Sequence, residues 1–358
     1  MSTAFRSRLA ALTAAAATHA APRHLVVLAV DGLPFEQAVA HWPHARTERL
    51  TSVRPTTSSA GWLSSLTGCP VAEHGVPGVV FSDPGGSGAL INVMEYAGPG
   101  LTPVRENIFS DAARSGLRPL AVLGDLEAYP SSWRDALLRH AEPVTGHRFY
   151  TGPGTVADGS YRPPPPGEVA GRLRSAIGTT LARYGGEGPC LLWCFVELDR
   201  HVHHHGYDSH VQQVLTRIGT LAQELADRGV AVAAHADHGL TPTRHDPGLQ
   251  LMLDRLGKEH RFTMGGAGRV RWLYPQTAGT DRLATVLRRE LPHDIRLVGT
   301  EELLEPGSLA GRRAGPLTLI AEGTGFLTDP AYTHDHGSAS PAELYTPLST
   351  WGFEGKTR

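Results

Sequence analysis

Five short segments of the sequence carry side chains suited to holding metal ions around a hydroxyl group. Four of them contain carboxylates or imidazoles, namely Asp31, Asp199 with His203, Asp237 with His238, and His336. The fifth, residues 55–59, is rich in hydroxyl groups and includes Ser58. Zinc accepts both kinds of ligand, and two divalent ions can stabilise the attacking and the leaving oxygen of a phosphoryl transfer. The set predicts a two-metal site with a hydroxyl nucleophile.

Each segment also has a plainer interpretation when it is taken alone. An Asp-Gly pair such as Asp31-Gly32 is typical of a turn or cap, and Ser or Thr before a helix is a common N-cap. The spacing of Asp199 and His203 favours a shared metal ion, because side chains four residues apart lie on one face of a helix. The hydroxyls of residues 55–59 precede a helical pattern, whose free N–H groups favour an anion. The segments therefore predict chemistry only if the fold brings them together.

Apolar runs alternate with helical patterns along the chain. Runs typical of buried strands lie at residues 25–30, 119–123, 191–196 and 230–234. Helical patterns lie between them at residues 62–66, 108–115, 168–184 and 211–228. The alternation predicts an α/β fold with a mainly parallel central sheet sandwiched by helices. Ligands bind beyond the carboxyl ends of strands in such sheets, which is where Asp31, Asp199 and Asp237 are expected.

One segment between the motifs is too long for a plain loop. Residues 241–330 separate His238 from His336 and contain a predicted strand at 269–274 and a predicted helix at 281–291. We expect this segment to form a small α+β insertion that caps or flanks the site. The whole chain, residues 1–358, is interpreted as a single catalytic domain that carries this insertion.

Composition excludes several classes of partner. The 358-residue chain is 41% hydrophobic and 19% charged, with a formal net charge of -2, which is typical of soluble globular proteins. No block of Lys or Arg stands out, so a nucleic-acid polymer is not expected as a partner. No apolar run approaches the ~20 residues that a membrane span requires, so no membrane is expected either. The expected partner is a small molecule.

The cysteines and the N-terminal segment bear on the compartment. Cys69, Cys190 and Cys194 form no pattern of regular pairs, which favours a reducing compartment. The Ala-rich residues 9–17 follow two arginines and superficially resemble a signal peptide, but a surface helix explains the same residues through the helix propensity of alanine. We expect a cytoplasmic protein, with export left open by this segment.

The motifs, in their order, resemble the alkaline phosphatase superfamily and, more narrowly, its type I phosphodiesterase/nucleotide pyrophosphatase branch. The resemblance runs from Leu25 to Leu348. The residues that carry it are Asp31, Pro55-x-x-Ser58, Thr67-Gly68, Glu73-His74-Gly75, Asp199-x-x-x-His203-x-x-Gly206, Asp237-His238-Gly239 and His336-Gly337.

The resemblance implies two zinc ions, although manganese or another divalent metal would suit the same ligands. It assigns one ion to Asp31, Asp237 and His238, and the other to Asp199, His203 and His336. It makes Ser58 both the nucleophile and an oxygen ligand, with a phosphoserine as the intermediate, and Thr57 is the alternative nucleophile. His74 is expected to brace the turn after Gly68 rather than to bind metal, and His336 is favoured over His334 as the late ligand because Gly337 follows it.

The chain departs from the branch at two positions near these motifs. It has Ser58 where the branch mostly has Thr, and Val79 where many relatives place an Asn that holds a phosphoryl oxygen. Asn92 is the candidate substitute for that substrate-binding Asn. A sulfatase is disfavoured, because residues 58–62 lack the Cys/Ser-x-Pro-x-Arg element of that class.

The predicted function is therefore a metal-dependent hydrolase of a small phosphate ester, with a nucleotide or another phosphodiester as the first choice. A phosphomonoesterase or a phosphonate hydrolase would use the same site. A phosphoryl transferase or mutase, or a non-catalytic metal-binding protein, is the alternative from another class. Specificity is expected from loops 82–100 and 151–167 and from the insertion. Trp133, Tyr150 or Tyr161 could stack on a base, although ordinary packing also explains them.

Overall fold

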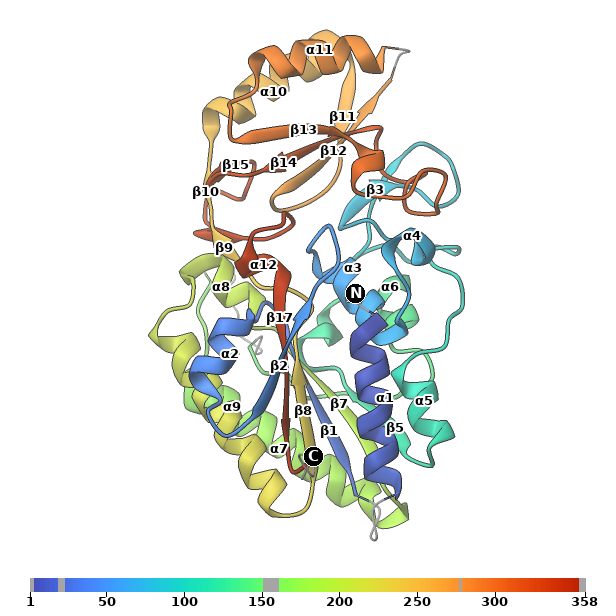
Figure 1. Cartoon of the computed structure of the whole chain (residues 1–358), viewed down its shortest axis with the longest axis vertical. Coiled ribbons are helices and arrows are strands. Elements are labelled where there is room, and N and C mark those ends of the chain that lie inside the picture. Colours follow the sequence, from blue (N-terminus) through green and yellow to red (C-terminus); the bar gives the residue numbers. More distant parts are fainter. Residues whose placement is uncertain (1–2, 19–22, 151–160, 277–278, 354–358) are drawn as a thin grey trace.

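The computed structural model describes residues 3–18, 23–150, 161–276 and 279–353. A seven-stranded sheet forms its centre (Figure 1). In spatial order the strands are β2 (Arg46–Thr51), β17 (Tyr345–Trp351), β8 (Ala231–His235), β1 (Leu25–Val30), β7 (Cys190–Val196), β5 (Arg118–Val122) and β6 (Glu142–Val144). From β8 to β6 all neighbours run parallel, whereas β17 is antiparallel to β8 and to β2. The predicted α/β fold with a mainly parallel sheet between helices is confirmed.

The four predicted strands are present with bounds shifted by at most one residue, as β1, β5, β7 and β8. Three further strands of the same sheet, β2, β6 and β17, were not predicted, and β6 is an edge strand of only three residues. Strand β2 is an edge strand with a mostly exposed, polar sequence, and β17 contains Pro347, which cannot donate a hydrogen bond to a neighbouring strand.

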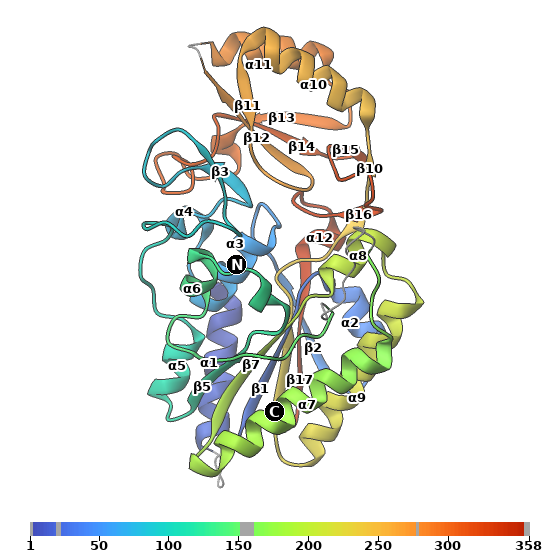
Figure 2. The ribbon, with the colours of Figure 1, turned by 180° about the vertical axis from the view of Figure 1, so that it is seen from behind.

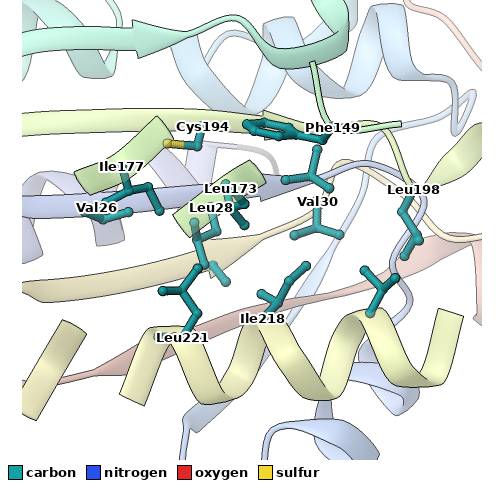
Figure 3. Packing of buried hydrophobic residues seen from close by; sticks show 14 of the residues in the cluster. Val26, Leu28, Val30, Phe149, Leu173, Ile177, Cys194, Leu198, Ile218 and Leu221 are labelled. Atoms are coloured by element: carbon teal, nitrogen blue, oxygen red, sulfur yellow. The ribbon is translucent and has the colours of Figure 1, made fainter. Parts of the chain in front are cut away.

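Three helices cover one face of the sheet, as Figure 2 shows from behind. They are α2 (Phe35–His41), α7 (Pro166–Tyr184) and α9 (Ser209–Asp227). Side chains alternate between faces along β1, so Val26, Leu28 and Val30 point to this side and join the core formed with α7 and α9 (Figure 3). This buried face fixes the strand whose carboxyl end carries Asp31.

Four helices lie on the opposite side: α1 (Thr3–Thr18), α3 (Ser58–Thr67), α5 (Ile108–Arg114) and α6 (Ser132–Leu137). The helix predicted in the Ala-rich segment is confirmed as α1. Its side chains Phe5 and Leu9 are buried, and the Phe5 ring stacks on His235 of β8 with centroids 3.6 Å apart. Within the described part of the chain, no helix is long and apolar enough to cross a membrane.

Residues 241–330 form a second, smaller sheet with two helices (top of Figure 1). Its antiparallel strands, in spatial order, are β11 (Phe262–Met264), β12 (Val270–Pro275), β14 (Leu317–Ala321) and β13 (Ile295–Gly299). The helices α10 (Pro247–His260) and α11 (Thr280–Glu290) share an apolar core with this sheet. The predicted strand and helix of the insertion correspond to β12 and α11.

Short elements complete the chain around the sheet and the insertion. The helical ones are α4 (Val71–His74), α8 (Asp199–His205), α12 (Pro341–Leu344) and the 3-10 turns η1 (Gly124–Ala128), η2 (Gly185–Glu187) and η3 (Thr300–Glu302). The strands are β3 (Val80–Ser82), β4 (Leu90–Asn92), β9 (Thr241–Pro242), β10 (Arg244–His245), β15 (Gly325–Phe326) and β16 (His334–Asp335). Most of the predicted loop at 151–167 lies outside the described residues.

Candidate active site

Three carboxylates stand where neighbouring parallel strands end. Asp31 directly follows β1, and its backbone N–H donates to the carbonyl of Val196 at the end of β7. Asp199 opens helix α8 after β7, and Asp237 follows β8. Because β8, β1 and β7 are adjacent in the sheet, their carboxyl ends bring these side chains to one edge.

The first group of possible metal ligands is Asp31, Asp237 and His238, whose ligand atoms all lie within 4.8 Å of one another. Nε2 of His238 is 3.2 Å from Oδ2 of Asp237 and 3.7 Å from Oδ1 of Asp31. All three side chains are buried. This is the set that the resemblance assigned to one ion.

Ser58 is the first residue of α3 and joins this group. Its Oγ lies 3.0 Å from Nε2 of His238 and 3.4 Å from Oδ1 of Asp31. The side chain of Thr57 is fully buried, and its hydroxyl is 3.5 Å from that of Ser59. Ser58 lines a cavity that lies beside this group, whereas Thr57 is not among the described residues that line that cavity.

A second group surrounds Asp199. Its Oδ2 lies 3.0 Å from Nε2 of His203, one helical turn further along α8, and its Oδ1 lies 3.8 Å from Nε2 of His336. The rings of His336 and His238 stack with centroids 3.9 Å apart, so the two groups are contiguous. The structure therefore brings together all seven residues that sequence reasoning placed at the metal site.

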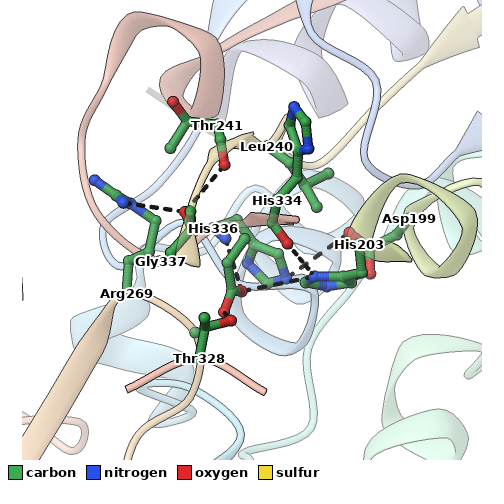
Figure 4. Close-up of polar contacts among 12 residues, drawn as sticks. Asp199, His203, Leu240, Thr241, Arg269, Thr328, His334, His336 and Gly337 are labelled. Carbon is green, nitrogen blue, oxygen red and sulfur yellow. Dashed lines mark hydrogen bonds and ion pairs between the residues drawn. The ribbon is translucent and has the colours of Figure 1, made fainter. Parts of the chain in front are cut away.

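Backbone carbonyls orient the three histidines in the same way. Nδ1 of His203 is 2.8 Å from the carbonyl oxygen of His334 (Figure 4). Nδ1 of His336 is 2.7 Å from the carbonyl oxygen of Thr56. Nδ1 of His238 is 3.3 Å from the carbonyl oxygen of Gly239. Each ring can donate its Nδ1 proton to a carbonyl, which leaves Nε2 free to bind a metal.

The electrostatics of the cluster are those of crowded, buried carboxylates. Burial, with the nearby charge of Asp199, raises the pKa of Asp31 to about 7. Burial and the charges of Asp31 and Asp199 raise the pKa of Asp237 well above its usual range. Burial opposes ionisation of Asp199, but His203 more than offsets this and lowers the pKa of Asp199. Asp31 and Asp237 therefore resist ionisation unless a positive charge, such as that of a bound metal ion, lies beside them.

Unpaired oxygen atoms mark the same place. Both carboxylate oxygens of Asp237 and Oδ1 of Asp199 are buried without a hydrogen-bond partner among the described residues. Buried polar atoms are normally paired, so these oxygens call for a ligand. Carboxylate oxygens with imidazole nitrogens are a donor set that zinc accepts. The residues present therefore fit divalent metal ions.

Sequence reasoning missed Asp335. This buried carboxylate accepts hydrogen bonds from the hydroxyl of Thr328 and from the backbone N–H of His336, and its Oδ1 is 3.8 Å from Nδ1 of His203. Its oxygen lies within 4.8 Å of nitrogens of His203 and His336, so it is a further possible ligand. Its position between two histidines, His334 and His336, was the available signal.

Other predicted residues lie elsewhere. The amide of Asn92 donates to Glu95 and accepts from the N–H of Met94 within its own turn, and Asn92 is not among the cavity-lining residues. The ring of His334 packs near Gly206 and Tyr207, apart from the ligand groups. His74 contacts the hydroxyl of Ser64 at 2.9 Å and accepts from the N–H of Val76, so it braces its turn as expected.

A cavity of about 300 Å³ opens beside both ligand groups. Its core side is lined mainly by apolar and aromatic side chains, namely Val79, Met94, Leu126, Tyr129, Trp133 and Phe195. The insertion contributes Ala267, Gly268, Arg271, Thr328 and Asp329 to the opposite side. A small organic group attached to a phosphoryl centre would thus contact both parts of the chain.

Comparisons with known proteins agree with this geometry. The family described as type I phosphodiesterase / nucleotide pyrophosphatase matches residues 25–340. A structure of murine ectonucleotide pyrophosphatase / phosphodiesterase 5 is similar with a TM-score of 0.66 and 16% identity, over 91% of this chain and 87% of that one. Phosphonoacetate hydrolase from Sinorhizobium meliloti, in complex with phosphonoacetate, is similar with a TM-score of 0.65 and 16% identity, over 92% and 89%.

An inactive variant of the murine protein in complex with AMP is similar with a TM-score of 0.67 and 16% identity, over 91% of this chain and 87% of that one. No curated protein sequence matches the chain. The family match covers most of the chain and includes every residue of the two ligand groups. The chain therefore belongs to the type I phosphodiesterase/nucleotide pyrophosphatase family of phosphoester hydrolases, within the alkaline phosphatase superfamily.

Proposed function

We propose that the protein hydrolyses a phosphodiester, with a nucleotide as the first candidate, at two zinc ions and through a phosphoserine at Ser58. The observation that carries this proposal is the position of the Ser58 hydroxyl, at the start of α3 and 3.0 Å from Nε2 of His238, beside carboxylate oxygens that lack partners. Asp31, Asp237 and His238 would hold one ion, and Asp199, His203 and His336 the other.

Zinc bound by these residues would neutralise the phosphoryl oxygens and stabilise the attacking and leaving oxygens. The chain's own residues supply the nucleophile and its placement. Oγ of Ser58 loses its proton and attacks phosphorus as the bond to the leaving oxygen breaks, which releases one alcohol and leaves a phosphoserine that still carries the second ester group. Water then cleaves the bond between Ser58 and phosphorus, which releases the phosphate monoester and restores the hydroxyl. The N-terminus of α3 directs free N–H groups towards the negative charge of the transferring group.

The substrate class rests on the cavity and on the family. The apolar and aromatic wall of the cavity suits an organic group of modest size on the phosphorus. A phosphonate hydrolase is a second candidate. The structure of phosphonoacetate hydrolase in complex with phosphonoacetate is about as similar to this chain as the structure of the murine protein, with TM-scores of 0.65 and 0.66. Residues 241–330 would act as a flanking subdomain, since Arg271 and Thr328 line the cavity.

We also propose that the protein works in the cytoplasm. The described structure contains three free, buried cysteines, Cys69, Cys190 and Cys194. Unpaired cysteines are typical of a reducing compartment.

Release of 4-nitrophenol from two chromogenic substrates tests the function. The zinc-loaded protein should hydrolyse bis(4-nitrophenyl) phosphate faster than 4-nitrophenyl phosphate. Mass spectrometry of protein that is acid-quenched during turnover of the diester should find a 4-nitrophenyl phosphoryl group on the peptide that contains Ser58. A faster reaction with the monoester would favour a phosphomonoesterase. No release from either ester by fully metallated protein would point to phosphoryl transfer or to metal binding without catalysis.

A further inference from the structure

A carboxylate outside the ligand groups lines the cavity and has one buried, unpaired oxygen. Glu197 follows strand β7 directly and lines the cavity together with Tyr129, from the segment after η1. The hydroxyl of Tyr129 donates to Oε1 of Glu197 at 3.1 Å. Oε2 of Glu197 is buried and has no hydrogen-bond partner among the described residues.

The surroundings of Oε2 make this arrangement unusual for a purely structural carboxylate. Leu126, Trp133 and Phe195 line the same cavity as Glu197, and neither Leu126 nor Phe195 has a side-chain donor. The indole N–H of Trp133 is already donated to the carbonyl of Ser59. A buried acceptor without a donor is costly, so a retained one marks a place where a ligand supplies the donor.

Two arginines near the cavity are engaged elsewhere. The guanidinium of Arg271 donates to the carbonyls of Gly268, Val270 and Leu327, all on the insertion side. The guanidinium of Arg200 affects Glu197 through its charge but lies over the ring of Tyr161, 5.5 Å from the centroid. Among the described residues neither arginine forms an ion pair with Glu197, so its second oxygen stays available.

We propose that Glu197, held in place by Tyr129, is a specificity-determining residue that accepts a hydrogen bond from the organic group of the substrate. The group it selects carries a donor that is neutral, such as a hydroxyl or amino group of a nucleoside or sugar, or positive, such as the ammonium of an amino alcohol. An organic group that ends in an ionised carboxylate has no donor to offer to Glu197 and would be disfavoured. This inference rests on the proposed function, because it concerns the substrate of the same site.

Binding measurements on the zinc-loaded full chain test the inference without relying on turnover. Isothermal titration calorimetry would compare four phosphorus ligands: AMP with neutral donors, phosphoethanolamine with an ammonium donor, ethyl phosphate with no donor on its organic group, and phosphonoacetate with a carboxylate. We expect AMP or phosphoethanolamine to bind about 10-fold or more tightly than ethyl phosphate, as befits one hydrogen bond to a buried acceptor that is otherwise unpaired. Tighter binding of AMP would identify a neutral donor as the preferred group, and tighter binding of phosphoethanolamine would identify an ammonium group.

Two substitutions test whether Glu197 and Tyr129 cause the preference for a ligand that carries a donor. Glu197→Gln keeps the shape of the side chain, and Tyr129→Phe removes the hydroxyl that fixes it. Glu197→Gln should reduce the preference for the donor-bearing ligand over ethyl phosphate by about 10-fold, and Tyr129→Phe by a smaller factor. Glu36→Gln on the exposed face of α2 is the matched control and should retain the preference. Zinc content, measured for each protein, excludes a loss of metal as the cause.

Several results would overturn the inference. They are equal affinity for ethyl phosphate and both donor-bearing ligands, tightest binding of phosphonoacetate, an unchanged preference in Glu197→Gln, or no binding of any of the four ligands. If bis(4-nitrophenyl) phosphate is hydrolysed while the donor preference is absent, the inference fails and the proposed function stands. If the donor preference and its loss in Glu197→Gln are seen without hydrolysis, the binding role of Glu197 stands and the proposed hydrolysis fails.

Discussion

The hydroxyl oxygen of Ser58 lies 3.0 Å from Nε2 of His238, at the point where α3 begins and the carboxyl ends of β1 and β8 meet. Ser58 comes from a helix start and His238 from a strand end, 180 residues apart along the chain. The relationship places one hydroxyl among the ligands of the first group and leaves the neighbouring hydroxyl of Thr57 buried behind it.

Ser58→Ala should abolish turnover of bis(4-nitrophenyl) phosphate, with kcat lower by roughly 10³-fold or more, because among the described residues only the Ser58 hydroxyl lies within hydrogen-bond distance of Nε2 of His238. Zinc content should fall little, since three other residues remain in the first group. Steady-state kinetics and metal analysis of the purified variant measure both effects.

Thr57→Val is the matched control for that experiment. The Thr57 side chain is fully buried and faces Ser59, so its loss should change kcat by only a few fold. Activity that survives in Ser58→Ala but disappears in Thr57→Val would transfer the nucleophilic role to Thr57.

A buried ion pair fastens the insertion to the core beside His336. Nε of Arg269 is 3.3 Å from Oε1 of Glu343, and both side chains are at most 3% exposed. The same guanidinium donates to the carbonyls of Ala321 and Gly323. Arg269→Met should lower the free energy of unfolding by about 3–5 kcal/mol, because it leaves Glu343 buried without its counter-charge. Urea denaturation measures the change.

The exposed pair between Arg255 and Glu259 on α10 is the control. Its partners are about half exposed, so Arg255→Met should cost less than about 1 kcal/mol. A cost for Arg269→Met no larger than that of Arg255→Met would show that the buried pair does not hold the insertion in place.

His74 should make folding sensitive to acid. Burial lowers its pKa to about 3 in the folded chain, whereas an unfolded histidine takes up a proton near pH 6.5. The unfolded state then binds more protons than the folded state between these values. The contribution of His74 to stability is therefore complete above about pH 6.5 and declines as the pH falls towards 3.

The comparison of wild type with His74→Gln measures this contribution. Between pH 7 and pH 5 the wild type should lose about 2 kcal/mol more stability than the variant. The difference cancels the titration of the metal ligands, which both proteins share. His44→Gln, at an exposed position, should keep the wild-type pH dependence. An equally steep loss in His74→Gln would mean that the buried imidazole is not the acid-sensitive group.

The sequence alone was sufficient to predict four of the five parallel strands of the sheet and the carboxylates that follow three of them. Strands β1 and β7 are buried on both faces, so they read as continuous apolar runs, and the carboxylates that follow them stand out as strand-end residues. The i, i+4 spacing of Asp199 and His203 likewise predicted their contact. Both residues lie in helix α8, where this spacing places their side chains on the same face.

Features fixed by tertiary contacts could not be predicted in this way. Asp335 and Glu197 are single carboxylates without a periodic pattern, and only the fold shows that both face the cavity. Asn92 was a reasonable substitute for a missing amide, but asparagine readily bonds to nearby backbone, and here it does so within its own turn. Edge strand β2 is too polar to resemble a buried strand.

The central claim is that two metal ions and Ser58 perform the hydrolysis, and a zinc titration tests it most directly. The rate of 4-nitrophenol release from bis(4-nitrophenyl) phosphate would be followed as zinc is added stepwise to chelator-treated protein. We predict no activity without metal and a rise that levels off when two zinc ions are bound per chain. Full activity in the metal-free protein, a plateau at one ion, or no activity with two ions bound would contradict the account.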